Sequence, residues 1–416
     1  MNFKKITAFI VLVCIGNLIY VQAQSGPPKP PIGKRWVLNP DFSDEFNGTE
    51  LDTDKWLDNH PTWKGREPGL FMSSQVSVKD GYLQIRGEKM KKDTIINAYN
   101  REMIFNVKGG AVVSKKAAFL GYYETKMKAS ATTMSATFWF STSKTSIGPN
   151  DCDKYGLEWD IQECIGRKGD FKGSFFASGM HSNAHFWYTD CEKKKHDYRA
   201  AQVRFEDDEV ASKDFHVYGG WWRDESSASY YYDNRAPKHQ YFYDKVKKKP
   251  FDKPMYMRLV CETYPFPWIE LPNDEELADP SKNVVYYDWV RGYKLVDFND
   301  ESHDTKQENP IRIYDEGVIF DSESIDLKSS KALKIPLSYK ANKDRVISFL
   351  LKDSEGKNIV DQKITAYAGY ANFEYDLKLK SKLKPSNTYV LLVTTYPIGD
   401  KKSFLDKSTL LINITK

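Results

Sequence analysis

The sequence contains few cysteines and no CxxC pair. Five cysteines occur among 416 residues, and Cys14 lies in an N-terminal segment that we expect to be removed. The other four, Cys152, Cys164, Cys191 and Cys261, are too few and too widely spaced for a zinc ribbon or a disulfide scaffold. This number fits one or two disulfides in an oxidising compartment, and it fits buried free thiols equally well.

A large excess of charge of one sign is also missing. The formal net charge is +4, and it falls to about +2 if the segment containing Lys4 and Lys5 is removed. Such a balance argues against the basic surface that nucleic-acid binding requires, so we expect no nucleic-acid partner. No apolar run after residue 23 is long enough to cross a membrane, so we expect no membrane span. We also expect a monomer.

The first 23 residues have the pattern of a secretory signal peptide. Two lysines form a short basic region, Ile6–Val21 is an uncharged apolar run, and Ala23 ends a segment of the A-x-A cleavage type. A membrane anchor is the alternative, but the run is short for one. The mature protein is therefore expected to be secreted, or held in the periplasm or at the cell surface. Residues 24–33 are rich in proline and are predicted to be an unpacked linker.

Helical periodicity is nearly absent, and short strand-like runs take its place. Val76–Arg86, for example, alternates between polar and apolar residues on both sides of an Asp-Gly pair, which is the signal of a β-hairpin. Such runs continue over residues 34–297 and predict an all-β sandwich or β-jelly roll. A polar segment, residues 298–309, is predicted to link it to residues 310–416, whose strand-like runs suit a smaller immunoglobulin-like β-sandwich.

One run, Glu158–Glu163, interleaves acids with apolar residues. Residues two apart on a strand face the same side, so Glu158 and Asp160 share a face. Glu163 is five positions from Glu158 and returns to that face only if a β-bulge adds one residue between Asp160 and Glu163. Trp159 and Ile161 would then face the opposite, apolar side. The alternative for such a short pattern is an ordinary exposed polar strand face.

Three crowded carboxylates have an unusual protonation chemistry. They repel one another when all are ionised, so one of them must carry or share a proton. Retaining glycosidases need this combination, with an ionised carboxylate as nucleophile and a protonated carboxyl as acid about 5 Å away. The acidic run therefore indicates a retaining glycosidase site if the bulge is present.

The run and its surroundings resemble glycoside hydrolase family sixteen, whose members are β-jelly rolls. Five elements in the family's order carry the resemblance: Ser43–Phe46 with Leu51–Trp56, Gly121–Trp139, Glu158–Glu163, Phe215–Asp233 and Tyr286–Arg291. The resemblance implies that Glu158 is the nucleophile, Asp160 the acid that tunes it, and Glu163 the general acid/base. It implies no cofactor for catalysis. Trp159 replaces the family's usual aliphatic residue, and we expect this to affect packing only.

The loop His60–Phe71 is similar to the early loop of agarases and porphyranases. That resemblance implies that Trp63 and Arg66 help to build the negative subsites, and Asn183–His185 and Cys261–Tyr264 are similar to the same branch. The implied partner is an agar-type galactan of red algae. The implied activity is endo-acting hydrolysis of β-1,4 linkages in agarose or porphyran. The alternatives are a carrageenase or laminarinase of the same family, a transglycosylase, and a non-catalytic galactan-binding jelly roll.

Four further residues are candidates for substrate binding. Trp139 suits stacking under a sugar ring, with a place in the core as the alternative. Aromatic residues make up 14% of the chain, which fits a β-rich core as well as a sugar site. His181 and His185 are predicted on a strand beside the acidic run, where at least one of them is expected to face the cleft. Glu262 is expected to bind a sugar hydroxyl.

Two charged features suggest an ion or a charged substituent. Asp288, on the last strand of the first domain, is a candidate ligand of a structural calcium ion, because calcium prefers oxygen ligands and relatives often hold one. The basic run Lys193–His196 is a candidate contact for sulfate esters, with a solvated loop as the alternative. Residues 310–416 contain no motif that selects between polysaccharide binding, a spacer role and a role in secretion.

Overall fold

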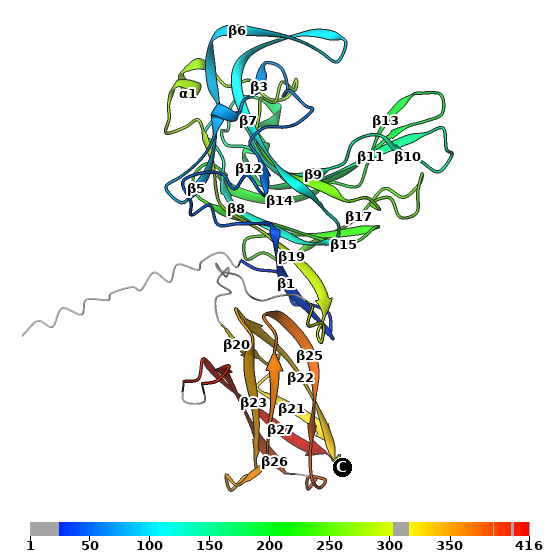
Figure 1. Cartoon of the computed structure of the whole chain (residues 1–416), viewed down its shortest axis with the longest axis vertical. Coiled ribbons are helices and arrows are strands. Elements are labelled where there is room, and N and C mark those ends of the chain that lie inside the picture. Colours follow the sequence, from blue (N-terminus) through cyan, green and yellow to red (C-terminus); the bar gives the residue numbers. More distant parts are fainter. Residues whose placement is uncertain (1–24, 303–315, 386, 401–402, 416) are drawn as a thin grey trace, which may run out of the picture.

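The computed structural model describes residues 25–302, 316–385, 387–400 and 403–415, and the predicted signal peptide lies outside this range. Strands dominate it, and a large two-sheet domain is followed by a smaller one (Figure 1). This confirms the predicted all-β fold class, a jelly-roll sandwich followed by a smaller β-sandwich. None of the described helices has the length and apolar character that a membrane-spanning helix needs.

The outer sheet of the first domain is antiparallel. In spatial order it contains β17 (Lys238–Tyr241), β16 (Ser227–Tyr232), β15 (His216–Asp224), β8 (Gly121–Lys128), β19 (Val284–Asp297) and β1 (Lys34–Asp44), and β5 (Tyr82–Arg86) with β4 (Val76–Lys79) joins it beside β19. The predicted hairpin is β4–β5. Its turn residues Asp80 and Gly81 have φ angles of 56° and 81°, as tight hairpin turns require.

The inner sheet carries the acidic run. In spatial order it contains β13 (Lys195–Arg199), β12 (Ser178–Thr189), β11 (Lys154–Ile165), β9 (Ser135–Ser141), β18 (Met255–Cys261), β7 (Arg101–Ala118) and β2 (Trp56–Leu57), with β10 (Ser146–Ile147), β14 (Val203–Val210), β3 (Gly69–Phe71) and β6 (Glu88–Ala98) paired at its margins. β6 and β7 form a long hairpin that projects from the sandwich at the end away from the second domain (Figure 1). The helical segments are short: two 3-10 turns, Ser73–Gln75 and Lys172–Ala177, and α1 (Asp274–Ala278).

Aromatic side chains fill the core between the two sheets. Phe138 and Phe140 of β9 and Trp159 of β11 are fully buried, because alternate residues of these strands face inward. Gly220 of β15 lies across from Trp159, and a Cβ atom there would come within 2.7 Å of the indole ring. The large ring is therefore accommodated by the missing side chain opposite it, and Trp159 faces the core as predicted.

The second domain is a sandwich of two smaller sheets. One contains β25 (Gly369–Lys378), β22 (Ala332–Ala341) and β20 (Gly317–Ile319); the other contains β21 (Ser324–Lys328), β27 (Asp406–Thr415), β26 (Thr388–Pro397), β23 (Arg345–Lys352) and β24 (Asn358–Ala366). Its core is separate from that of the first domain and includes Ile335, Phe349 and Leu391, none of which is exposed. The domain thus has the buried apolar cluster that an independently packed unit needs.

The two domains share one continuous sheet. β1 pairs with β25 over Lys34–Trp36, so the outer sheet of the first domain runs on into the second. The buried Arg35 donates from Nη1 to the carbonyl oxygen of Ala368 at 2.8 Å and from Nη2 to that of Asp300. Gly369 allows β25 to lie this close to β1, because a Cβ atom at this position would lie 2.0 Å from the carbonyl oxygen of Trp36. The domains are therefore docked by backbone pairing.

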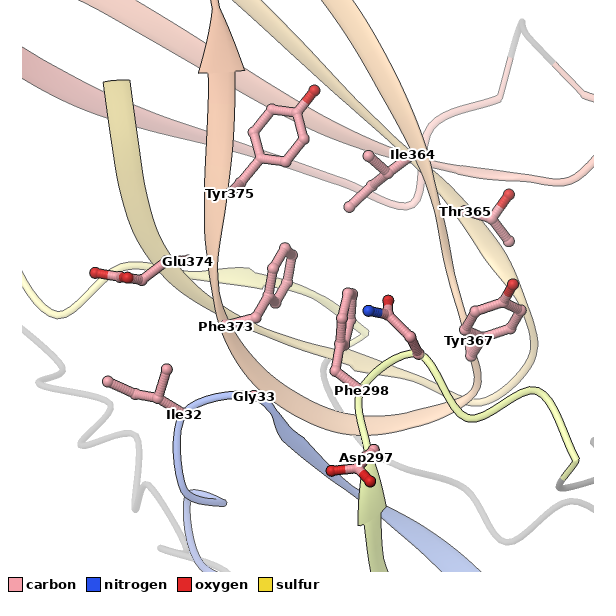
Figure 2. A pocket seen from close by; sticks show the side chains of 11 residues that line it. Ile32, Gly33, Asp297, Phe298, Ile364, Thr365, Tyr367, Phe373, Glu374 and Tyr375 are labelled. Atoms are coloured by element: carbon pink, nitrogen blue, oxygen red, sulfur yellow. The ribbon is translucent and has the colours of Figure 1, made fainter. Parts of the chain in front are cut away.

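The segment after β19 also packs. Phe298 stacks on Phe373 of the second domain, with ring centroids 4.2 Å apart (Figure 2). A cavity of about 800 Å³ at the junction is lined by both rings and by Ile32 and Tyr367. Residues 298–309 were predicted to link the two domains, and at Phe298 this segment packs on an apolar surface of the second domain. Residues 303–309 lie outside the described range.

The proline-rich segment contacts both domains. Gly26 donates from its backbone N–H to the buried carboxyl group of Glu124 at 2.9 Å. The carbonyl oxygen of Pro28 accepts a hydrogen bond from the Trp36 indole, and that of Pro30 accepts one from Asn372. The prediction of an unpacked linker is wrong for residues 25–33. Prolines lack a donor, but their carbonyl oxygens can accept from side chains that belong to folded strands.

The four cysteines in the described part of the chain divide into one disulfide and two thiols. Cys152 and Cys191 are bonded across 39 residues. Cys164 and Cys261 are buried free thiols within the core of the first domain. Both of the alternatives that the sequence left open are therefore present together. The disulfide lies just outside the first residue of β11 and the last residue of β12, which pair as Lys154 with Thr189.

Candidate active site

β11 brings its three acids to one face through a β-bulge. Its register with β9 shifts between Asp160 and Gln162, which confirms the predicted bulge. Glu158 and Glu163 are partly exposed, whereas Trp159 between them is fully buried. Glu158 and Glu163 are five residues apart and would face opposite sides of a regular strand. The bulge adds one residue between them, so both side chains face the same side.

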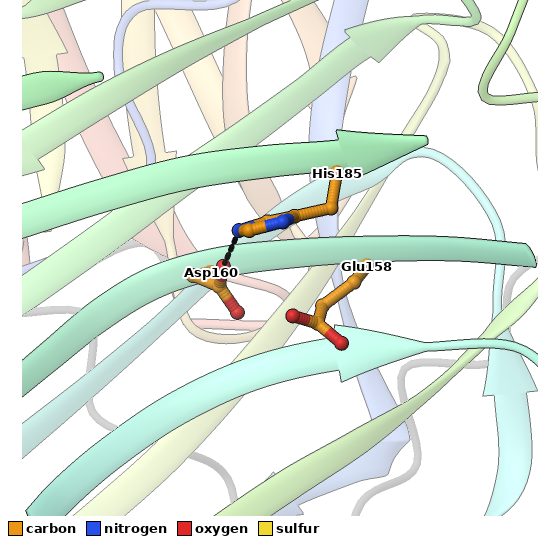
Figure 3. Close-up of side chains that lie close together, drawn as sticks. All are labelled: Glu158, Asp160 and His185. Carbon is orange, nitrogen blue, oxygen red and sulfur yellow. Dashed lines mark ion pairs between the residues drawn. The ribbon is translucent and has the colours of Figure 1, made fainter. Parts of the chain in front are cut away.

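Glu158, Asp160 and His185 form a close cluster (Figure 3). His185, on β12, lies with Nε2 3.4 Å from Asp160 Oδ2 and with Nδ1 2.7 Å from Asp197 Oδ1 on β13. Burial acts to lower the pKa of His185, but the ionic contact with Asp160 and the hydrogen bond with Asp197 outweigh it and raise the pKa to about 10. An imidazolium ion therefore lies between two carboxylates and holds Asp160 in place.

Glu163 has the environment of a proton donor. Burial raises its pKa to about 8, and the negative charge of Asp160 acts in the same direction. Tyr264 donates its hydroxyl proton to Glu163 Oε1 at 2.8 Å, which opposes the rise by stabilising the ionised form. At neutral pH Glu163 is mostly protonated, as a general acid must be at the start of a reaction.

Glu158 is held by the neighbouring strand. Trp187 of β12 donates its indole N–H to Glu158 Oε2 at 3.2 Å. Burial and the charge of Asp160 raise the pKa of Glu158, while His185 and Lys144 act to lower it. The two positive groups therefore favour the ionised form of Glu158, which is the form that a nucleophile needs.

The structure brings Trp63, Arg66, Trp139 and Glu262 together. The Arg66 guanidinium lies 5.6 Å from the Trp63 ring centroid, and Trp63 lies edge-on to Trp139 at 6.2 Å. Arg66 donates from Nε to Glu262 Oε2 at 3.2 Å. Because the carboxyl group of Glu262 is buried against Arg66, its contact is with the arginine, and its part in the site is to hold Arg66.

Arg258 and His60 belong to the same part of the cleft, and the sequence analysis missed both as site residues. Arg258 lies 4.8 Å from the Trp139 ring centroid, and its Nε donates to His60 Nε2 at 3.2 Å. Burial and the charge of Arg258 lower the pKa of His60 to about 4. A neutral imidazole therefore accepts from the arginine. A lone arginine within the apolar strand Met255–Cys261 was the available signal, because buried arginines are rare.

His181 lies apart from the acids. Its side chain is buried, its ring packs 4.6 Å from that of Phe176, and its Nε2 contacts the carbonyl oxygen of Ser178. Burial lowers the pKa of His181 to about 4. The structure thus places one of the two predicted histidines, His185, beside Glu158 and Asp160, and places the other in an aromatic cluster.

The surroundings of Asp288 do not suit calcium. Lys126 of β8 places its ammonium nitrogen 2.7 Å from Asp288 Oδ2, so a positive group already occupies the position beside this carboxylate. Among the described residues, a group of potential metal ligands does occur at Glu158, Asp160 and His185. There His185 holds a proton on each ring nitrogen at neutral pH and has no lone pair for a metal.

Several residues of the site come from segments without a recognisable motif. Lys144 lies in the loop between β9 and β10, Trp187 at the end of β12, and Asp197 on β13. The basic run Lys193–His196, which was predicted to meet sulfate esters, is divided. His196 pairs with Asp190, while the three lysines before it are exposed. Lys144, Trp187 and Asp197 lie near Glu158 and Asp160 because of how the strands pair. A single sequence does not reveal that register.

Comparison with known proteins identifies the family of each domain. The family described as "Beta-porphyranase A-D, GH16 domain" matches residues 36–295, and the family described as "Porphyranase-associated domain" matches residues 318–407. The chain is 66% identical to beta-porphyranase D of Zobellia galactanivorans over 396 residues, which covers 95% of this chain and 93% of that protein.

Two solved structures resemble the first domain. A beta-porphyranase from the human gut bacterium Bacteroides plebeius is 37% identical, with a TM-score of 0.60 over 65% of this chain and 95% of that one. Porphyranase B of Zobellia galactanivorans is 32% identical, with a TM-score of 0.55 over 65% of this chain and 98% of that one. The chain therefore belongs to glycoside hydrolase family 16, in the family of the beta-porphyranases A to D.

Proposed function

We propose that the protein is a secreted, endo-acting, retaining hydrolase that cleaves β-1,4-galactosidic linkages of porphyran. The observation that carries this proposal is the placement of two carboxyl groups on one strand face with different partners. Burial raises the pKa of both, that of Glu163 to about 8, and only Glu158 has the indole of Trp187 and the charge of Lys144 acting in the opposite direction. Two such groups can divide the roles of acid and nucleophile.

The reaction proceeds in two steps. Glu158 attacks the anomeric carbon while Glu163 protonates the departing glycosidic oxygen, which yields a glycosyl-enzyme and an ionised Glu163. Glu163 then removes a proton from water, the water attacks the anomeric carbon, and Glu158 leaves as a carboxylate. Asp160, fixed by His185, keeps negative charge beside both groups and so keeps the proton on Glu163 before the first step.

Porphyran is favoured over agarose by the relatives. Beta-porphyranase D at 66% identity and two solved porphyranases support porphyran. An extracellular agarase of Streptomyces coelicolor is 27% identical over 296 residues and is more distant. Trp63 and Arg66 supply an aromatic face and a cation in the cleft, which suit a sugar that carries an anionic group. Secretion is supported by the signal-peptide pattern of residues 1–23.

Product analysis on a panel of polysaccharides tests the proposal. Porphyran, agarose, carrageenans and laminarin are incubated with the full chain, and reducing ends and oligosaccharide sizes are measured. We expect oligosaccharides of mixed length from porphyran, and NMR should show the β-anomer as the first product. Glu163→Gln should reduce kcat by about 100-fold to 10,000-fold. Release of the α-anomer first, or full activity of Glu163→Gln, contradicts the mechanism; activity confined to agarose or laminarin contradicts the substrate.

A further inference from the structure

Lys144 and Trp187 lie on the side of the catalytic strand away from Trp63 and Arg66. β11 has β9, with Trp139, on one side and β12, with Trp187, on the other. Trp187 pairs directly with Gly156 of β11, two residues before Glu158. A polysaccharide that crosses β11 from Trp139 therefore passes next over Gly156 and Trp187.

Gly156 provides the space in which Lys144 lies. A Cβ atom on Gly156 would come within 2.8 Å of both Cα and Cγ of Lys144, so any other residue would displace the loop. The lysine stem therefore rests on the strand backbone, and its Nζ lies 3.4 Å from the ring centroid of Trp187. An ammonium group over an indole face is a favourable cation–π contact. The position of this charge is thus fixed by two independent features.

The charge of Lys144 has no carboxylate within ion-pair distance among the described residues. Glu158 and Asp197 act on it from further away, and Lys195 and Arg66 oppose them. The Lys144 side chain is exposed, so an anionic group of a ligand can reach its ammonium. The same ammonium covers the ring of Trp187, so that ring is not free to stack under a sugar. A positive group held in this way is suited to an anionic substituent of the substrate.

We propose that Lys144 and Trp187 form an anion subsite that binds a sulfate ester on a sugar beyond the cleaved bond, as seen from Trp63 and Arg66. The inference rests on the proposed function, because it takes the substrate to be a sulfated galactan that crosses β11. With Arg66 on one side and Lys144 on the other, the enzyme selects substrates that carry anionic groups on both sides of the cleaved bond. The competing explanation is that Lys144 serves only to keep Glu158 ionised.

Binding to an inactive full-length variant separates these explanations. Glu163→Gln protein is titrated by calorimetry with porphyran oligosaccharides and with the same oligosaccharides after chemical desulfation. Adding Lys144→Met keeps the stem over Gly156 and removes only the charge. We expect it to weaken binding of the sulfated ligand by about tenfold and of the desulfated ligand by less than about twofold. Lys144→Arg should retain most of the affinity for the sulfated ligand.

The matched control is Lys294→Met, which removes an exposed lysine from β19 in the outer sheet. We expect it to leave both affinities unchanged, and this excludes a general effect of net charge. Equal weakening of both ligands by Lys144→Met overturns the proposal. So does unchanged binding of the sulfated ligand.

Different results would contradict the proposed function and the proposed subsite. If the wild-type chain releases no reducing ends from porphyran, the substrate assignment is wrong whatever Lys144 does. If the wild type degrades porphyran and the Lys144→Met variant binds both oligosaccharides as the parent does, only the subsite is wrong. A further variant, Gly156→Ala, should reproduce the sulfate-specific loss, because it displaces Lys144 without removing its charge.

Discussion

The hydrogen bond from Tyr264 to Glu163 makes a quantitative prediction about the pH dependence of catalysis. The Tyr264 hydroxyl is buried, and it donates to Glu163 Oε1 at 2.8 Å. A hydrogen bond to a charged acceptor contributes about 1.5–3 kcal/mol, and one pKa unit corresponds to about 1.36 kcal/mol. Part of this hydrogen-bond energy is retained when Glu163 is neutral. We therefore expect Tyr264→Phe to raise the pKa of Glu163 by about one unit.

The sign follows from the role of Glu163. The free enzyme is active while Glu163 is protonated, so kcat/KM falls as the pH rises through about 8. In Tyr264→Phe the ionised carboxylate loses a donor, protonation persists to higher pH, and the alkaline limb should move to about pH 9. The assay is kcat/KM on a defined porphyran oligosaccharide between pH 5 and pH 10.

Tyr188→Phe is the matched control. Its hydroxyl also donates to a buried carboxylate, that of Asp153 at 2.6 Å, so its loss removes a comparable hydrogen bond that does not involve Glu163. The alkaline limb of this variant should stay where it is in the wild type. An alkaline limb of Tyr264→Phe that stays in place or moves to lower pH would refute the assignment of that limb to Glu163.

Three further predictions concern the supports of the site and the fold. Asp197→Asn should lower the pKa of His185 from about 10 towards its ordinary value, measured by NMR of the labelled imidazole, and should lower kcat by about tenfold with little change in KM; an unchanged titration of His185 contradicts this. Replacing Cys152 and Cys191 by serine should lower the free energy of unfolding by about 2–4 kcal/mol in denaturant titrations, because it opens a loop of 39 residues. Arg35→Met leaves two carbonyl groups at the domain junction without a donor, so calorimetry should show two separated transitions in place of a coupled one; a single unchanged transition would show that the strand pairing alone couples the domains.

The catalytic strand was predictable because its information is local. Alternation with period two assigns Trp159 to the core and Glu158 with Asp160 to the open face, and the odd position of Glu163 demands a bulge. All of these follow from one short run of sequence, and the register with β9 bears them out. Similarly, the Asp-Gly turn defines the β4–β5 hairpin without any knowledge of the rest of the fold.

The packing of the proline-rich segment and of Phe298 was not predicted, because it depends on a surface elsewhere in the chain. A proline-rich segment has no propensity to form a sheet or helix, yet Trp36 and Asn372 donate to its carbonyl oxygens. Phe298 stands in a polar segment, and its burial depends on Phe373, 75 positions later. Neither partner is marked as such in a single sequence, because long-range pairing leaves no periodic pattern.

The electrostatic roles in the site depend on register in the same way. Glu158, Asp160 and Glu163 are equivalent carboxylates as far as β11 alone is concerned. What makes them unequal is β12, which places His185 opposite Glu158 and Trp187 opposite Gly156, together with β13, which adds Asp197. A shift of one residue in the β11–β12 register would turn each of these side chains to the other face of the sheet. The proposed division into nucleophile and acid therefore depends on the strand pair.

The dependence of the site on the β11–β12 register links the disulfide to the chemistry of the site. Cys152 and Cys191 join the start of β11 to the end of β12, at the end of the strand pair where Lys144 lies over Gly156. At this end β11 pairs with the short strand β10 and β12 pairs with β13, and exposed loops lie beyond both pairs. A covalent link there opposes slippage and fraying at the position where a small movement would uncouple Lys144 and Trp187 from Glu158. We therefore expect loss of the bond to disturb the charge pattern of the site as well as the stability of the fold.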